Sequence, residues 1–134
     1  MLIDRVRFTA HPELNFTVIV NPSSGPGSSP LPNDDYSVQV QQLNAYPNVR
    51  KVGYVRTGYA TRDIATVLQD VSTYSGWASN STTLAMDGIF FDEVASEYSQ
   101  TMAEYYSSIN EAVKNASGLQ LERTVRDQTC SQPF

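Results

Sequence analysis

Three short apolar runs, each ended by polar or turn-forming residues, divide the chain. They cover Phe16–Val20, Val49–Val55 and Gly88–Phe91. β-Branched and aromatic residues dominate these runs, which is typical of strands. Because the runs lack a regular polar alternation, we expect strands that are buried on both faces, as in a parallel sheet.

The segments between these runs have the spacing of amphipathic helices. The first helix is predicted to begin at an N-cap of Asn33 or Asp34 and to end before Pro47, and the second to begin at Thr61. The third follows the last strand, and Gly118 is its predicted C-terminal stop. The apolar faces of the second and third helices are Ile64, Val67, Leu68, Val71 and Tyr74, and then Tyr98, Met102, Tyr105, Ile109, Val113 and Ala116.

Strands that alternate with helices predict an α/β fold with about three βα units and a parallel sheet. A complete (β/α)₈ barrel needs about 250 residues, whereas this chain has 134. The pattern therefore predicts either a small open α/β sheet or part of a barrel.

The third run ends in two adjacent acids, Asp92 and Glu93. A buried strand has no structural use for such a pair, and the carboxyl ends of parallel strands are where α/β folds place their chemistry. This pattern favours an acid-based site that hydrolyses sugars, because glycoside hydrolysis usually uses two carboxyl groups. Adjacent strand residues point to opposite faces, so a regular strand would not aim both acids at one bond. The alternative is an acid pair that stabilises the dipole of the next helix.

Other residues near the predicted strand ends are candidates for substrate binding. Tyr54 and Tyr59 either stack on sugar rings or pack in the core or at its rim. Arg56 either binds substrate or pairs with Asp92. Asn21 opens a long loop that is rich in proline, glycine and serine, and that either shapes the substrate site or only connects two elements.

Two positions have structural interpretations. Asp87 precedes its strand, at the opposite end from the acids, and is predicted to be a turn residue. Trp77 ends the second helical pattern and is predicted to pack in the core.

Composition excludes several classes of function. The net charge of −5 and the pI near 4.6 argue against a nucleic-acid partner, which needs a basic patch. The single Cys130 rules out an internal disulfide, and the single His11 makes a histidine-based metal site improbable. We therefore expect neither a metal nor an organic cofactor.

Features related to secretion point in different directions. The first ten residues lack the apolar stretch of a signal peptide, and no run is long enough to span a membrane. Three glycosylation sequons begin at Asn15, Asn80 and Asn115, whereas the triplet at Asn21 is excluded by its proline. Such triplets are common by chance, so they are a weak indication of secreted ancestry.

Four segments resemble the spherulin-4 family, also called spherulation-specific family 4. They are Phe16–Gly27, Leu43–Val49, Val52–Thr57 and Asp87–Glu93, and they occur in the family's order and spacing. The family is similar to glycoside hydrolases and includes the Sph3-type enzymes of glycoside hydrolase family 135. The resemblance extends over about Ala10–Gly118.

This resemblance implies a (β/α)₈ barrel that carries out endo-hydrolysis of galactosaminogalactan, an α-1,4-linked polymer of galactose and N-acetylgalactosamine. It also implies a secreted or fungal cell-surface protein with a polysaccharide substrate. The family's acidic pair falls on Asp92 and Glu93, which makes them the predicted catalytic residues. A further glutamate on a later strand completes the family's acidic cluster.

The chain also departs from the family pattern. It begins inside the family's first helix, and residues 119–134 have no strand pattern and match nothing in the family. We therefore expect a truncated member: an incomplete domain over residues 1–118, holding strands two to four, and an atypical tail over 119–134 without the later glutamate. The absence of a visible signal peptide is consistent with an intracellular protein or an incomplete gene model.

A partial barrel would leave two open sheet edges, which predicts self-association. The alternative to a hydrolase is a truncated non-catalytic domain that binds carbohydrate or another protein.

Overall fold

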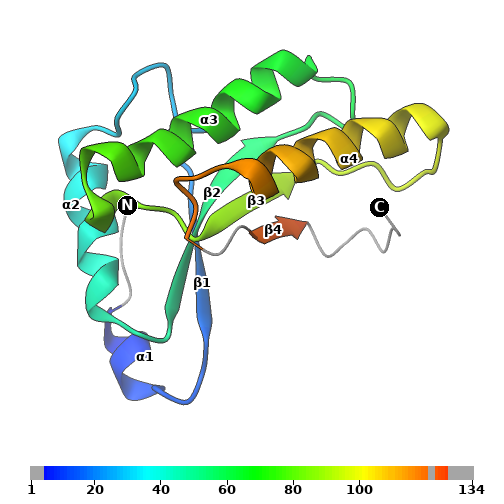
Figure 1. Ribbon diagram of the computed structural model, residues 1–134. Coiled ribbons are helices and arrows are strands. Elements are labelled where there is room, and N and C mark those ends of the chain that lie inside the picture. Colours follow the sequence, from blue (N-terminus) through cyan, green and yellow to red (C-terminus); the bar gives the residue numbers. More distant parts are fainter. Residues whose placement is uncertain (1–4, 121–122, 127–134) are drawn as a thin grey trace.

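The computed structural model describes residues 5–120 and 123–126 of the chain. Strands and helices alternate along it (Figure 1). The elements are α1 (Arg5–Ala10), β1 (Phe16–Val20), α2 (Asp34–Gln42), the 3₁₀ turn η1 (Leu43–Ala45), β2 (Val49–Arg56), α3 (Ile64–Asn80), the 3₁₀ turn η2 (Thr82–Leu84), β3 (Gly88–Asp92), α4 (Gln100–Asn115) and β4 (Arg123–Arg126).

The strands form one parallel sheet in the order β1-β2-β3-β4. Because each strand lies beside its neighbour in sequence, every crossover advances in the same direction, and a single hand of crossover then places the helices on one face. Doubly wound sheets reverse direction and carry helices on both faces. The observed order is that of an arc of a (β/α)₈ barrel, which confirms the expected fold class.

Strand β4 was not expected. The prediction that residues 119–134 contain no strand was wrong for Arg123–Arg126, which pairs in parallel with β3 from Gly88 to Phe91. A parallel neighbour satisfies the backbone of a short segment whatever its side chains are, and charged residues at both ends of this segment hide its strand pattern. The other tail residues, 121–122 and 127–134, lie outside the described residues.

The core lies between the sheet and the helices that cover it. Tyr74 and Trp77 of α3 are fully buried with their rings 4.9 Å apart, which confirms the packing role predicted for Trp77. The Tyr74 hydroxyl donates to the carbonyl of Val20, 3.0 Å away. Gly53 of β2 lies under the Tyr74 ring, where an added Cβ would come within 2.6 Å of ring carbon. Glycine is therefore required for α3 to approach the sheet so closely.

Strand β1 differs from the expectation that all strands are buried on both faces. Val20 is fully buried, but its neighbour Ile19 is 43% exposed. In the described part of the chain β1 is at the edge of the sheet, and the helices cover only one of its faces. Alternate residues of β1 therefore face away from the core.

Two of the three predicted helices need corrected boundaries. Asn33 caps α2 as predicted, its Oδ1 accepting the Tyr36 amide at 2.9 Å. However, α3 is capped by Asp63, because the predicted cap Thr61 donates its hydroxyl to the carbonyl of Gly58 instead.

The C-terminal helix α4 also differs in its boundaries. It begins after the N-cap Ser99, so Tyr98 precedes the helix and is 65% exposed rather than part of its packed face. It ends at Asn115, three residues before the predicted stop at Gly118. An added Cβ at Gly118 would lie 1.9 Å from the carbonyl oxygen of Ser75, so this glycine permits a close approach to α3.

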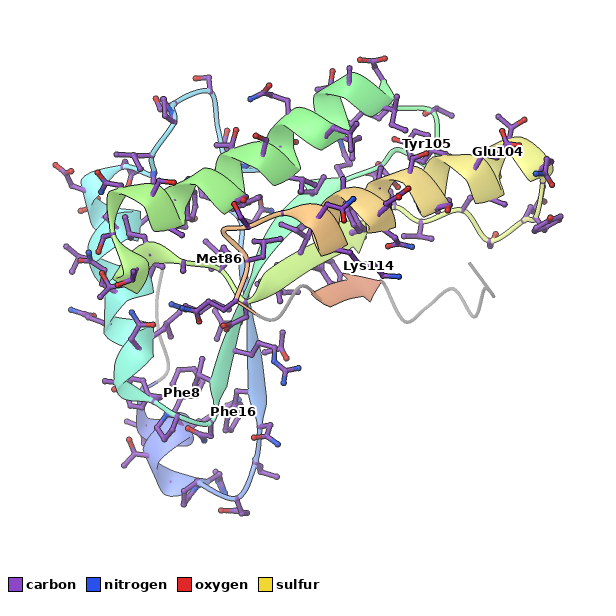
Figure 2. The ribbon with its side chains drawn as sticks, in the orientation of Figure 1. Phe8, Phe16, Met86, Glu104, Tyr105 and Lys114 are labelled. Atoms are coloured by element: carbon purple, nitrogen blue, oxygen red, sulfur yellow. The ribbon has the colours of Figure 1, made fainter. Side chains whose placement is uncertain are left out.

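Helix α1 packs against the beginning of the sheet. The Phe8 ring lies 5.1 Å from that of Phe16 (Figure 2). It also lies 5.3 Å from that of Tyr46. None of the helices in the described part of the chain is long and apolar enough to cross a membrane.

Candidate functional site

The two predicted catalytic acids lie at the carboxyl end of β3. Asp92 is the last residue of the strand, and Glu93 follows it with a φ of 56°, in the left-handed region that residues other than glycine rarely adopt. This conformation ends the alternation of the strand. The argument that a regular strand aims the two acids at opposite faces therefore does not apply at Glu93.

Asp92 is held by a side chain of the neighbouring strand. The Tyr54 hydroxyl donates to Asp92 Oδ2 over 2.6 Å, a short distance typical of a bond to an ionised acceptor. Tyr54 is opposite Phe90, and because side chains two residues apart share a face, it reaches Asp92 along that face. Burial and then the bond to Asp92 raise the pKa of Tyr54 to about 12, so the hydroxyl remains a donor at neutral pH.

The Glu93 carboxylate is the freer of the two. Its residue is half-buried, and its side chain forms no hydrogen bond with any residue in the described ranges. Its backbone is fixed, because the Tyr59 amide donates to the Glu93 carbonyl at 2.7 Å. A carboxyl group is thus presented on an anchored backbone without a side-chain hydrogen bond to any described residue.

A buried threonine anchors the bend that carries both acids. The amide of Thr57 donates to the Asp92 carbonyl at 3.1 Å, and its hydroxyl lies 3.0 Å from that carbonyl and 2.8 Å from the Glu93 carbonyl. Tyr106 of α4 supports the same bend, since its hydroxyl accepts the Ala95 amide at 2.8 Å. Backbone strain at Glu93 is therefore compensated by contacts from Thr57, directly after β2, and from Tyr106 of α4.

Sequence reasoning did not single out Thr57 or Tyr106. Both are buried, and a buried hydroxyl needs a partner. The available signals were Gly58, which marks a turn directly after Thr57, and a second tyrosine beside Tyr105 in the helical pattern. Neither signal indicates that the two hydroxyls meet at the acidic bend.

Arg56 and Tyr59 lie beside the acids. Arg56 is opposite Asp92 in the sheet, but among the described residues its exposed side chain forms no ion pair with that acid. Arg56 was predicted either to bind substrate or to pair with Asp92, and the pairing is not observed. Tyr59 is 58% exposed and also has a left-handed φ of 56°, so its ring lies outside the core.

Asn21 lies at the end of β1, and its groups serve the loop that follows. Its Oδ1 accepts the Gly25 amide at 2.9 Å, and its carbonyl accepts the Tyr36 hydroxyl at 3.2 Å. The side-chain oxygen of Asn21, a residue predicted to bind substrate, is thus engaged within the protein. Of the other predicted binding residues, Tyr54 bonds to Asp92, Arg56 is opposite Asp92 in the sheet, and the Tyr59 amide bonds to the Glu93 carbonyl.

The alternative explanation of the acid pair was stabilisation of the next helix. Helix α4 begins at Gln100 behind the cap Ser99, and its first turn contains no acidic residue. Dipole effects fall off within one turn, so Asp92 and Glu93 lie too early in the chain to stabilise α4.

The described residues also contain no group of three potential metal ligands.

Asp87 lies at the other end of β3. It was predicted to be a turn residue, but its hydrogen bonds connect it to strand β2. Its Oδ2 accepts the amide of Lys51 at 2.7 Å, and its own amide donates to the Lys51 carbonyl at 2.8 Å. The Lys51 ammonium is buried and donates to Asn44 Oδ1 at 2.6 Å. Burial lowers the pKa of Lys51, and the charge of Asp87 opposes this shift.

Known proteins resemble this chain in sequence and fold. A family model described as spherulation-specific family 4 matches residues 5–130. Spherulin-4 of Physarum polycephalum is 34% identical over 115 residues, which are 86% of this chain and 32% of that protein. A crystal structure of Aspergillus clavatus Sph3 in complex with GalNAc matches with a TM-score of 0.85 and 41% identity, over 89% of this chain and 48% of that one.

The chain thus spans about a third of the first relative and about half of the second. The family model runs through residue 130, so it includes most of the segment after Gly118 that we expected to lie outside the resemblance. The predicted resemblance is confirmed: the chain belongs to spherulation-specific family 4.

Proposed function

We propose that this chain forms part of a glycoside hydrolase site for a polysaccharide that contains N-acetylgalactosamine, as in α-1,4-linked galactosaminogalactan. The observation that carries the proposal is the arrangement at the end of β3. There Asp92 is oriented by a 2.6 Å bond from Tyr54, beside a Glu93 whose carboxylate has no partner among the described residues.

Asp92 and Glu93 are proposed to divide the work of hydrolysis. Cleavage adds water across the glycosidic bond: the leaving oxygen gains a proton, and the anomeric carbon gains a hydroxyl. The unpartnered Glu93 suits proton transfer, because its carboxyl group has no internal bond to break first. Asp92, fixed by Tyr54, suits a group that faces the developing positive charge on the sugar.

The proposed sugar comes from chemistry and from the family. Exposed aromatic rings and hydrogen-bonding groups near the acids suit a ring that is apolar on one face and rich in hydroxyls at its edge. Tyr59 supplies an exposed ring and Arg56 an exposed donor. Sph3, which is 41% identical to this chain, has been crystallised with GalNAc.

The test is release of new reducing ends from a galactosamine-containing polymer by the purified chain. We expect Glu93→Gln and Asp92→Asn each to remove release. Glu111→Gln should leave it unchanged, because it alters charge equally at an exposed position late in α4. Unchanged release by Glu93→Gln would contradict the assignment.

A non-catalytic carbohydrate-binding domain is the second candidate. Hydrolysis usually needs two carboxyl groups on either side of the bond. Among the strand ends with described side chains, only the end of β3 presents carboxylates, since β1 is followed by Asn21 and β2 ends in Arg56. The two proposals differ in turnover: this candidate predicts that the wild-type chain binds an N-acetylgalactosamine oligosaccharide without shortening it, and that Asp92→Asn weakens binding.

A further inference from the structure

The asparagines of this chain fall into two groups that differ in what their side chains do. Four of the five that are not in glycosylation sequons form side-chain hydrogen bonds: Asn21, Asn33, Asn44 and Asn48. The three that begin sequons, Asn15, Asn80 and Asn115, form none with any residue in the described ranges.

We propose that Asn15, Asn80 and Asn115 are acceptors of N-linked glycans. The side chains of all three are exposed, and so are the hydroxyl residues that complete the sequons, Thr17, Thr82 and Ser117. An attached sugar would displace no internal bond at these positions. At Asn48, in contrast, the two hydrogens of Nδ2 are shared among three carbonyls, and a glycan there would replace one of these hydrogens and disrupt the set.

All three acceptors lie at one edge of the fold. Asn15 directly precedes β1, Asn80 is the last residue of α3 and Asn115 is the last residue of α4 (Figure 1). In parallel βα units, helices end where strands begin, so these positions share the amino edge of the sheet. Asp92 and Glu93 lie at the carboxyl edge, and glycans at the amino edge would leave them accessible.

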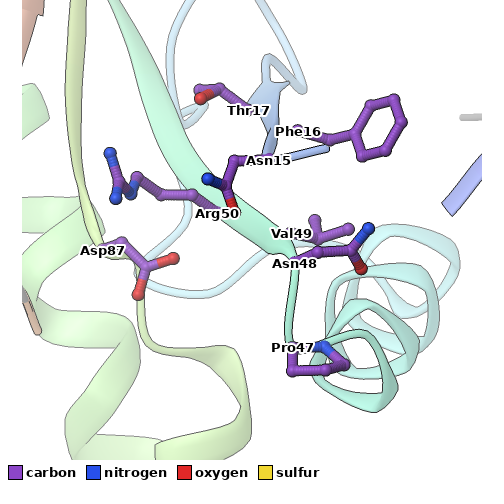
Figure 3. A pocket seen from close by; sticks show the side chains of 8 residues that line it. All are labelled: Asn15, Phe16, Thr17, Pro47, Asn48, Val49, Arg50 and Asp87. Atoms are coloured by element: carbon purple, nitrogen blue, oxygen red, sulfur yellow. The ribbon is translucent and has the colours of Figure 1, made fainter. Parts of the chain in front are cut away.

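Each acceptor also lines a surface hollow. Asn15 lies with Arg50 and Asp87 around a hollow of about 240 Å³ (Figure 3). Asn80 borders one of about 480 Å³, whose lining includes Ser72 and Thr73 of α3. Asn115 borders one of about 300 Å³. The first sugar of each glycan could lie along such a hollow, with hydroxyl groups of the lining within reach at Asn80.

The modification is a group transfer from a polyprenyl-pyrophosphate-linked oligosaccharide. The asparagine Nδ2 forms a bond to the anomeric carbon, and the bond from that carbon to the pyrophosphate oxygen breaks. Nδ2 loses one proton, and the lipid pyrophosphate leaves. This inference is independent of the proposed hydrolysis, because no acceptor belongs to the acidic site.

The test is expression of the chain behind a secretory leader in a eukaryotic host, followed by intact-mass analysis before and after peptide-N-glycosidase treatment. We expect three removable glycans and the loss of one in each of Asn15→Gln, Asn80→Gln and Asn115→Gln. Asn110→Gln, which changes an asparagine outside any sequon, should not alter the pattern. A secreted chain without removable glycan would overturn the proposal.

A matched pair of variants tests whether an acceptor asparagine must have a side chain without internal hydrogen bonds. Arg50→Thr creates a sequon at the engaged Asn48, whereas Arg50→Val has nearly the same shape and creates none. We expect modification at Asn48 to lower secretion and thermal stability relative to Arg50→Val, while glycans at the natural sites leave the melting temperature unchanged or raise it. Equal secretion and equal thermal stability of Arg50→Thr, with its glycan at Asn48, and Arg50→Val would contradict the argument from hydrogen bonds.

Discussion

The two ends of strand β3 carry the same kind of residue in opposite circumstances. Asp87, just before the strand, binds the backbone amide of Lys51 at 2.7 Å and lies beside a buried ammonium. Asp92, the last residue of the strand, is bound by the side chain of Tyr54, and the adjacent Glu93 has no side-chain partner among the described residues. An acid whose bonds hold the backbone serves the fold, whereas an acid held only by another side chain, or unbound, is available to a ligand.

The asparagines follow the same division. Asn48 at the amino edge donates to the carbonyls of Phe8, His11 and Leu14, and so attaches α1 and the loop after it to β2. Asn15 lines the same surface hollow as Asn48 and precedes β1. Its side chain has no such bond within the described ranges. Residue type alone therefore does not indicate whether a polar side chain is structural.

The largest expected effect is on activity at the carboxyl edge. Glu93→Gln should reduce polysaccharide cleavage by about 10²- to 10⁴-fold, the contribution typical of a residue that transfers a proton. The free energy of unfolding should be unchanged, since the substitution breaks no described side-chain hydrogen bond. The measurement is reducing-end release together with a urea denaturation curve. A loss of stability that accompanies the loss of activity would show that the residue is structural.

The next effect concerns stability at the amino edge. Asp87→Ala should lower the free energy of unfolding by about 1–3 kcal/mol, because it leaves the Lys51 amide without its acceptor and the Lys51 ammonium without a nearby opposite charge. Asp92→Ala should cost less, since the Tyr54 hydroxyl that it leaves without an acceptor is on a half-buried side chain that can bond to water. Urea denaturation of both variants measures the difference. If Asp92→Ala were the more destabilising, the comparison of the two ends would be wrong.

A smaller effect should follow from loosening the bend. Thr57→Val keeps the shape of the side chain but removes the hydroxyl that contacts the carbonyls of Asp92 and Glu93. We expect a loss of about 0.5–1.5 kcal/mol in stability, the usual value for such bonds, and a fall in kcat larger than any change in KM. Thr57→Ser should restore both, and a kcat equal to wild type in Thr57→Val would exclude a positioning role.

The smallest effect is a dependence on alkaline pH. The pKa of Tyr54 is raised from its ordinary value of 10.0 to about 12, mainly by burial and then by its bond to Asp92. Its protonated form is thus favoured by folding, so the stabilisation is complete below pH 10 and is lost as pH rises towards 12. Tyr54→Phe should therefore lose less stability over this range than wild type, as followed by denaturation at pH 9 to 11.5. An identical pH dependence would contradict this role for the hydroxyl.

Strands β1, β2 and β3 could be predicted because their apolar runs end in clear turn residues. Strand β4 could not, since Arg123-Thr124-Val125-Arg126 contains one aliphatic residue, and its pairing with β3 is supplied by the sheet. The position of Asp92 and Glu93 at the carboxyl end of a strand was also predictable, because they follow an apolar run. Their geometry was not, because the left-handed φ of Glu93 depends on Thr57 and Tyr59, which are distant in sequence.

The central claim is that the carboxyl edge binds sugar while the amino edge supports the fold. The most direct test is an NMR titration of the isotopically labelled chain with an α-1,4-linked oligosaccharide of N-acetylgalactosamine. The account predicts shifts in amide signals of residues 54–59 and 92–95, with those of residues 48–51 and 87 unchanged. Shifts confined to the amino edge, or none at saturating sugar, would contradict it.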